Sequence, residues 1–101
     1  MNEAAAPAVR CAAEIVTPNA SRYLQQLCKH FAHKIPARYD ERAGDVAFPK
    51  GACHLDAADG LLTITLASPD AAQMAELQDV VVRHLVRFAF REELRIAWQP
   101  R

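Results

Sequence analysis

A hairpin pattern in the middle of the chain decides the fold, and it reads Ala52-Cys53-His54-Leu55-Asp56-Ala57-Ala58-Asp59-Gly60-Leu61-Leu62-Thr63-Ile64-Thr65-Leu66-Ala67. The pair Asp59-Gly60 is a strong signal for a tight turn between antiparallel strands. Apolar residues and threonines alternate after this turn, as is typical of a strand with one buried face. Cys53 and Leu55 fit the same buried layer before it. The stretch therefore predicts a β-hairpin with strands over residues 52–57 and 61–67.

Further strands are expected on both sides of this hairpin. Residues 9–16 alternate between apolar and polar side chains, which indicates a half-buried strand. Residues 37–41 and 45–48 read as two short strands around a glycine, and residues 94–98 as a last strand with apolar residues on one side. Short connections between consecutive strands require antiparallel pairing.

Two amphipathic helices complete the pattern. We predict the first helix over about residues 18–34, with Thr17-Pro18 at its start. We predict the second over residues 70–90, with Ser68-Pro69 at its start. Proline is favoured at the first position of a helix and serine or threonine just before it, so both junctions are expected to use the same capping chemistry. The apolar surface of the second helix extends past a single face. We therefore expect it to be deeply embedded or covered by a partner.

The predicted order of elements is β-α-β-β-β-β-α-β. Two amphipathic helices need one sheet face to cover. The sequence thus predicts an α+β fold, a two-layer sandwich with a mostly antiparallel sheet and two long helices on one face. We expect a single domain over residues 1–101, with residues 1–8 disordered. The order also resembles the TATA-box-binding-protein-like topology, which as an analogy of fold carries no implication of DNA binding.

Composition excludes several classes of protein. The formal net charge is zero, which argues against a nucleic-acid partner. No apolar run approaches the roughly 18 residues that a membrane-spanning helix requires. The first eight residues lack the basic start and long apolar core of a signal peptide. Three widely spaced cysteines do not form a disulfide pattern, so we expect reduced thiols and a cytoplasmic location.

Residues 28–34, Cys28-Lys29-His30-Phe31-Ala32-His33-Lys34, look at first like a metal-binding segment. A helix turns about 100° per residue, so Cys28 faces the core with its apolar neighbours while His33 faces outward. We therefore expect no metal and no cofactor. No serine elbow or glycine-rich phosphate loop is present, so catalysis is less favoured than binding. A small enzyme or metal-binding protein that uses His30, His84 and Cys53 stays open as an alternative.

A binding site is expected where the two helices meet. His30 and His84 flank the apolar stripes of their helices and could line one seam, either as packing residues or as ligand-binding or pH-sensing groups. Basic residues gather at the helix ends, where they could attract an anion or only neutralise the helix dipoles. The candidate ligand-binding residues are His30, Lys34, Arg38, His84, Arg87 and Arg91.

Phe90 lies near the polar stripe of the second helix, away from the core position of Phe88. Packing against the last strand is the favoured interpretation. Exposure would instead make Phe90 an anchor for a partner. A homodimer through helix 70–90 is the corresponding alternative function.

Two blocks of the sequence resemble a family of small bacterial proteins of unknown function. The first block is residues 17–35, which span the predicted first helix. The second is residues 83–92, together with Trp98. The resemblance implies an association with siderophore and iron-uptake gene neighbourhoods, and it supplies no catalytic residues. It favours a non-catalytic binding or accessory module, with a small anionic ligand or a partner protein of iron uptake.

Overall fold

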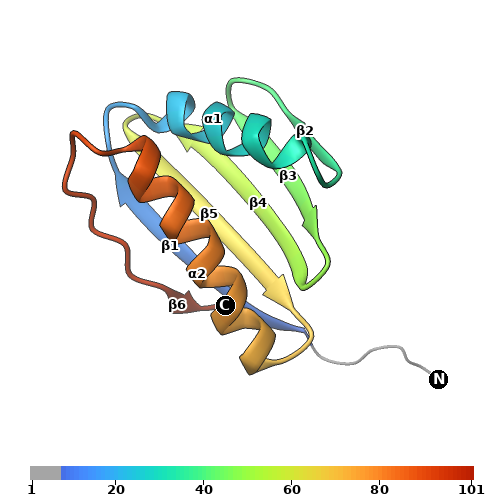
Figure 1. Cartoon of the computed structure of the whole chain (residues 1–101). Helices are drawn as coiled ribbons and strands as arrows, with labels where there is room; N and C mark the ends of the chain where they lie inside the picture. Colours follow the sequence, from blue (N-terminus) through green and yellow to red (C-terminus); the bar gives the residue numbers. More distant parts are fainter. Residues whose placement is uncertain (1–7) are drawn as a thin grey trace.

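The structure, a computed structural model, describes residues 8–101 (Figure 1). The prediction of disorder over residues 1–8 falls almost entirely on residues outside this range. The elements follow one another as β1 (Val9–Val16), α1 (Ala20–Ala32), β2 (Ala37–Tyr39), β3 (Ala43–Phe48), β4 (Gly51–Ala58), β5 (Leu61–Ser68), α2 (Ala71–Phe88) and β6 (Gln99–Pro100). The predicted order of strands and helices is confirmed.

The strands form one sheet in the order β2-β3-β4-β5-β1-β6, and every neighbouring pair is antiparallel. The hairpin predicted from residues 52–67 is its centre. Asp59 and Gly60 form the turn with φ angles of 50° and 74°, the left-handed conformation that such a turn needs. β1 pairs along the whole of β5, with Ala13 opposite Ile64. This register places the apolar residues of both strands on one face.

Both helices cover that same face (Figure 1). α1 packs on β2, β3 and β4, while α2 packs mainly on β5 and β1. The inward side chains of both layers form one core, which includes Leu24, Leu55, Ile64, Leu77 and Leu85, each 1% exposed or less. The predicted α+β sandwich, with two helices on one face of an antiparallel sheet, is confirmed.

Gly44 allows α1 to approach β3 closely. A Cβ atom at Gly44 would lie 2.6 Å from the sulfur of Cys28 and 3.1 Å from the Cβ of Tyr39. Cys28 is fully buried, as the helical geometry of residues 28–34 predicts. The thiols of Cys11, Cys28 and Cys53 are all free and buried.

The two strand-to-helix junctions differ, so the prediction of shared capping chemistry is wrong. α1 starts after Asn19, whose side chain makes no capping bond. α2 starts after Asp70, whose carboxylate accepts a 2.8 Å bond from the amide of Gln73. The hydroxyls of Thr17 and Ser68 are both buried. That of Thr17 accepts a 3.1 Å bond from the backbone amide of Asn19 and donates to Glu92, whereas that of Ser68 donates to the carbonyl of Lys50.

The C-terminal segment also departs from prediction. α2 ends at Phe88, and residues 94–98 form no strand; they pack irregularly with Leu94, Ile96 and Trp98 against the core. The short strand β6 instead pairs with the middle of β1. Phe90 is 75% exposed, so the favoured interpretation that it closes the core is wrong. In residues 8–101 no helix combines the length and hydropathy needed to cross a bilayer.

Candidate functional site

The last turn of α1 and the middle of α2 bring two histidines together. The ring centroids of His30 and His84 lie 4.8 Å apart. Phe31 lies 4.9 Å from His84 and Phe88 lies 6.0 Å from His30, again between ring centroids. The prediction that both histidines line one seam between the helices is confirmed by this geometry.

The hydrogen bonds of the two rings differ. Nδ1 of His84 lies 2.7 Å from the carbonyl oxygen of Val80, one turn earlier in α2. A carbonyl only accepts, so Nδ1 carries the proton and Nε2 of His84 remains available to another group. For His30 the structure of residues 8–101 gives no hydrogen-bond partner. The ring of His84 is therefore held in place by a hydrogen bond, whereas the ring of His30 is not.

These histidines line two adjoining hollows, which together we call the histidine groove. One, of about 380 Å³, is bounded by His30, Phe31, His33, Lys34, Ile35 and His84. The other, of about 340 Å³, is bounded by His30, His84, Arg87 and Phe88. No carboxylate lines either hollow.

The electrostatics of the groove follow from this lining. Partial burial lowers the pKa of His30 below its ordinary value of 6.5, and the positive charges of His84, His33, Arg87 and Lys34 lower it further. Desolvation and nearby cations both disfavour the charged form of an imidazole. An anion placed in the groove would reverse that effect, because it would stabilise the charged ring.

The six residues predicted from the sequence do not form one site. His30, Lys34, His84 and Arg87 are brought together at the histidine groove. Arg38 lies on β2 at a shallow hollow of the sheet edge that Asp45 also lines. Arg91 lines a separate hollow beyond the end of α2. The structure thus gathers four of the six residues at the groove, places Arg91 in a neighbouring hollow that shares Phe88, and leaves Arg38 at the sheet edge.

The basic residues of the groove are not neutralised by salt bridges. Within residues 8–101, Arg83 pairs with Asp79 at 2.9 Å and Lys50 pairs with Glu76. No such ion pair forms at Lys34 or Arg87 in the described part of the chain. On α2, an acidic residue one turn away therefore neutralises Arg83 and not Arg87.

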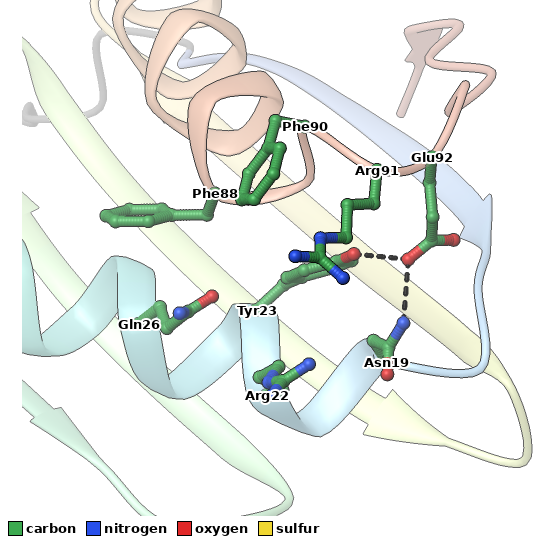
Figure 2. A pocket seen from close by; sticks show the side chains of 8 residues that line it. All are labelled: Asn19, Arg22, Tyr23, Gln26, Phe88, Phe90, Arg91 and Glu92. Atoms are coloured by element: carbon green, nitrogen blue, oxygen red, sulfur yellow. Dashed lines mark hydrogen bonds between the residues drawn. The ribbon is translucent and has the colours of Figure 1, made fainter.

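A second hollow, of about 380 Å³, surrounds Glu92 just beyond α2 (Figure 2). Its carboxylate accepts bonds of 2.9 and 3.0 Å from the hydroxyl of Thr17 and one of 2.8 Å from the amide of Asn19. The hydroxyl of Tyr23 also donates to it. We call these four residues the Glu92 cluster. They connect the start of α1 to the segment after α2.

The Glu92 cluster stabilises a negative charge with neutral donors. The Tyr23 hydrogen bond, followed by those of Asn19 and Thr17, lowers the pKa of Glu92. Burial, and then the bond to Glu92, raises the pKa of Tyr23. Sequence reasoning missed this cluster, because 75 positions separate Thr17 from Glu92 and no local spacing pattern links them.

Cys53 lies in the core under the helices, and burial raises its pKa far above the ordinary value. The adjacent His54 points to the outer face of the sheet, where it contacts Asp45 at 2.7 Å and Asp56 at 3.0 Å. Their opposite orientation agrees with strand alternation. A protonated, buried thiol is a poor nucleophile and metal ligand. In residues 8–101 no three potential ligands among His, Cys, Asp and Glu gather around one point.

The family becomes clear from the comparison with known sequences. Residues 12–99 match the model of a family described as "uncharacterized protein conserved in bacteria (DUF2218)". The chain belongs to this family. The DUF2218 match covers both α1 and α2 and therefore the histidine groove and the Glu92 cluster. Among curated proteins none matches the sequence.

A solved structure supports the fold of this DUF2218 protein. The NMR structure of PA4090 from Pseudomonas aeruginosa is 38% identical in sequence. The similarity covers 91% of this chain and 96% of that one, with a TM-score of 0.76. The resemblance of the two helical blocks to a bacterial family of unknown function is thus confirmed.

Proposed function

We propose that this protein is a non-catalytic binding module that holds a compact anionic ligand in the histidine groove. The observation that carries the proposal is the pairing of His30 with His84, 4.8 Å apart, beside Lys34 and Arg87 in a groove that no carboxylate lines. Basic groups that lack partners in a concave site favour a negatively charged ligand.

The groove has groups suited to such a ligand. Lys34, just after α1, and Arg87, on α2, supply permanent positive charge. A guanidinium binds a carboxylate or phosphate through two parallel hydrogen bonds. His30 is mainly neutral at pH 7 and takes up a proton when an anion offsets the surrounding charges. The hollow volumes of 380 and 340 Å³ fall within the range typical of small-ligand sites.

We further propose that the ligand comes from bacterial iron uptake, as an anionic ferric chelate. The support is the resemblance of residues 17–35 and 83–92 to a family associated with siderophore gene neighbourhoods. Those two blocks also supply the groove residues His30, His84 and Arg87. The basic side chains of the groove would contact the peripheral carboxylate or phenolate oxygens of the chelate. No protein atom need replace a ligand of the iron.

Isothermal titration with ferric hydroxamate, catecholate and citrate chelates tests this function, with inorganic phosphate as a simpler probe. We expect at least one probe to bind, and Lys34→Gln or Arg87→Gln to weaken that binding about tenfold. Arg83→Gln is the matched control, because Arg83 lies on the same helix but is paired with Asp79. Absence of heat from all four probes, or equal loss in the control, would refute the proposal.

A homodimer is the second candidate function. Val86 and Phe90 are 47% and 75% exposed, although both are large and apolar. Val86 lies on the last turn of α2 and Phe90 lies just beyond the end of the helix, so the two exposed side chains can anchor a second copy. Light scattering should then give a dimer mass that Phe90→Ser reduces to that of a monomer. A monomer at high concentration of the wild type would exclude this assembly.

A further inference from the structure

A line of polar residues extends along α1 beyond the histidine groove. Arg22, Gln26 and His30 follow one another at intervals of four residues, and Lys34 continues the series just after the helix. Residues four apart lie one above the other on a helix. This series connects the hollow around Glu92 with the groove around His30.

The two regions meet at Phe88. Its side chain lines both the hollow that contains Arg87 and the hollow that contains Arg22 and Arg91. Figure 2 shows Phe88 and Phe90 on one side of the latter hollow, and Arg22 and Gln26 on the other. The histidine groove and the hollow around Glu92 therefore form adjacent parts of one cleft between α1 and the end of α2.

Both ends of this cleft are basic. In residues 8–101 no salt bridge forms at Arg22 or Arg91, as at Lys34 and Arg87. Among residues 8–101 the one carboxylate that lines the cleft is that of Glu92, and Figure 2 shows it turned toward Asn19 and Tyr23. Its charge is thus stabilised by the cluster. The guanidinium of Arg91 lies over the ring of Phe90, 5.3 Å from its centroid, a contact that leaves its N–H groups free to bind an anion.

The middle of the cleft has a different character. The half-buried ring of Phe88 offers apolar contact there. The Oε1 atom of Gln26 is buried, and it has no hydrogen-bond partner in the described residues. Buried polar atoms are normally paired, so this part of the cleft wall is not fully satisfied by the protein's own hydrogen bonds.

We propose that the cleft binds an elongated dianion, with one anionic group between Lys34 and Arg87 and the other between Arg22 and Arg91. This inference rests on the proposed function, since it extends the same histidine groove. The first anionic group lies beside His30, which both hollows of the groove share. Arg22 and His30 lie eight positions apart on a helix that rises about 1.5 Å per residue, so the two anionic groups are separated by about 12 Å. The apolar middle of the ligand lies over Phe88.

A series of linear dicarboxylates tests the inference by NMR titration of the full chain. Succinate is too short to reach both ends, adipate is intermediate, and sebacate is long enough. We expect sebacate to bind at least tenfold more tightly than succinate, because the second contact becomes intramolecular once the first is made. Octanoate, with a similar apolar chain and one carboxylate, is the matched ligand control and should bind no better than succinate.

Variants separate the two ends of the cleft. The double variant Arg22→Gln with Arg91→Gln should reduce the affinity for sebacate to that for octanoate, and should leave succinate binding unchanged. Lys34→Gln should weaken both ligands, and Arg83→Gln should weaken neither. Titration with sebacate should shift the backbone amide signals around both Arg22 and His30. Titration with succinate should shift only those around His30. Unchanged amide spectra of the free variants show that each one folds.

The outcomes distinguish the two proposals. Sebacate affinity equal to that of succinate or octanoate, or equal loss of succinate binding in the arginine double variant, overturns the elongated ligand and leaves the anion groove intact. Failure of every anion, including phosphate and the ferric chelates, to shift His30 or His84 overturns both.

Discussion

The hydroxyl of Tyr23 on α1 donates a hydrogen bond to the carboxylate of Glu92, which follows it by 69 positions, beyond α2. Tyr23 is only 4% exposed, so its hydroxyl depends on this partner. Thr17, at the end of β1, donates to the same carboxylate. One acidic side chain thus connects a strand and both helical segments, and it fixes the wall of the cleft that carries Arg91.

Replacing Tyr23 with phenylalanine should destabilise the protein. A hydrogen bond to a charged group contributes about 1.5–3 kcal/mol to the free energy of unfolding, so we expect Tyr23→Phe to lose an amount in that range. Urea denaturation measures it. Tyr39→Phe is the matched control, because Tyr39 is 41% exposed and its loss should change stability by less than about 0.5 kcal/mol. Equal effects of the two changes would show that the Glu92 cluster contributes nothing.

The same cluster should make stability sensitive to acid. The pKa of Glu92 is lowered in the folded state, chiefly by the Tyr23 bond. Its contribution is therefore fully present above the pKa of the unfolded chain and is lost as pH falls through the folded pKa. The carboxyl ¹³C shift of Glu92 should report a pKa below the ordinary glutamate value, and Tyr23→Phe should raise it. A normal glutamate pKa in the wild type would contradict the cluster geometry.

His30 and His54 should titrate on opposite sides of 6.5. Partial burial and surrounding cations lower the pKa of His30, whereas the hydrogen bond to Asp45, assisted by the nearby charge of Asp56, raises that of His54. Imidazole ¹H–¹³C spectra measure both in one experiment. Arg87→Gln should raise the pKa of His30 and leave that of His54 unchanged. In the wild type, an anion that binds in the histidine groove should also raise the pKa of His30.

The two histidines therefore affect stability with opposite signs. For His30 the unfolded chain binds the proton more readily, so stability falls as pH decreases below about 6.5. For His54 the folded chain binds it more readily, so its contribution is present below the unfolded pKa and is lost as pH rises through the folded one. Asp45→Asn should reduce the contribution of His54 and lower its pKa, with the contact to Asp56 left in place. An unaltered His54 titration in that variant would refute the assignment.

Gly44→Ala should destabilise the packing of α1 on the sheet. The added Cβ would approach the sulfur of Cys28 to 2.6 Å, and overpacking of this kind costs about 1–3 kcal/mol. Cys28→Ala removes the obstructing sulfur. The double variant should therefore lose less stability than the sum of the two single changes, as measured by urea denaturation. Additive losses would show that the sulfur does not limit the space at Gly44.

The native thiols should react slowly. Cys11, Cys28 and Cys53 are all buried, and burial raises the pKa of Cys28 to about 11. A bulky disulfide reagent should label the native protein at least a hundredfold more slowly than the urea-unfolded protein, since the thiolate is the reactive form. Rapid labelling of Cys28 and Cys53 without denaturant would contradict the sandwich.

The sequence by itself determined the layers of this protein. Alternation in residues 61–67 and the turn at Asp59-Gly60 set the central hairpin, because side-chain period and turn chemistry are local properties. The helical spacing of residues 28–34 likewise placed Cys28 in the core. The positions of His30 and His84 could also be predicted, because each flanks an apolar stripe and the pattern shows which way that stripe faces.

Tertiary structure alone decided which polar groups meet. The hydroxyl of Thr17 lies where a cap is expected, yet it bonds to Glu92, which no local pattern connects to it. Arg38 and Arg91 look like members of one basic cluster in the sequence, but the sheet edge and the end of α2 carry them apart. Hydrophobic periodicity specifies which face of an element is buried. The same periodicity does not specify how two helices are arranged on the sheet, and that arrangement forms the cleft between α1 and the end of α2.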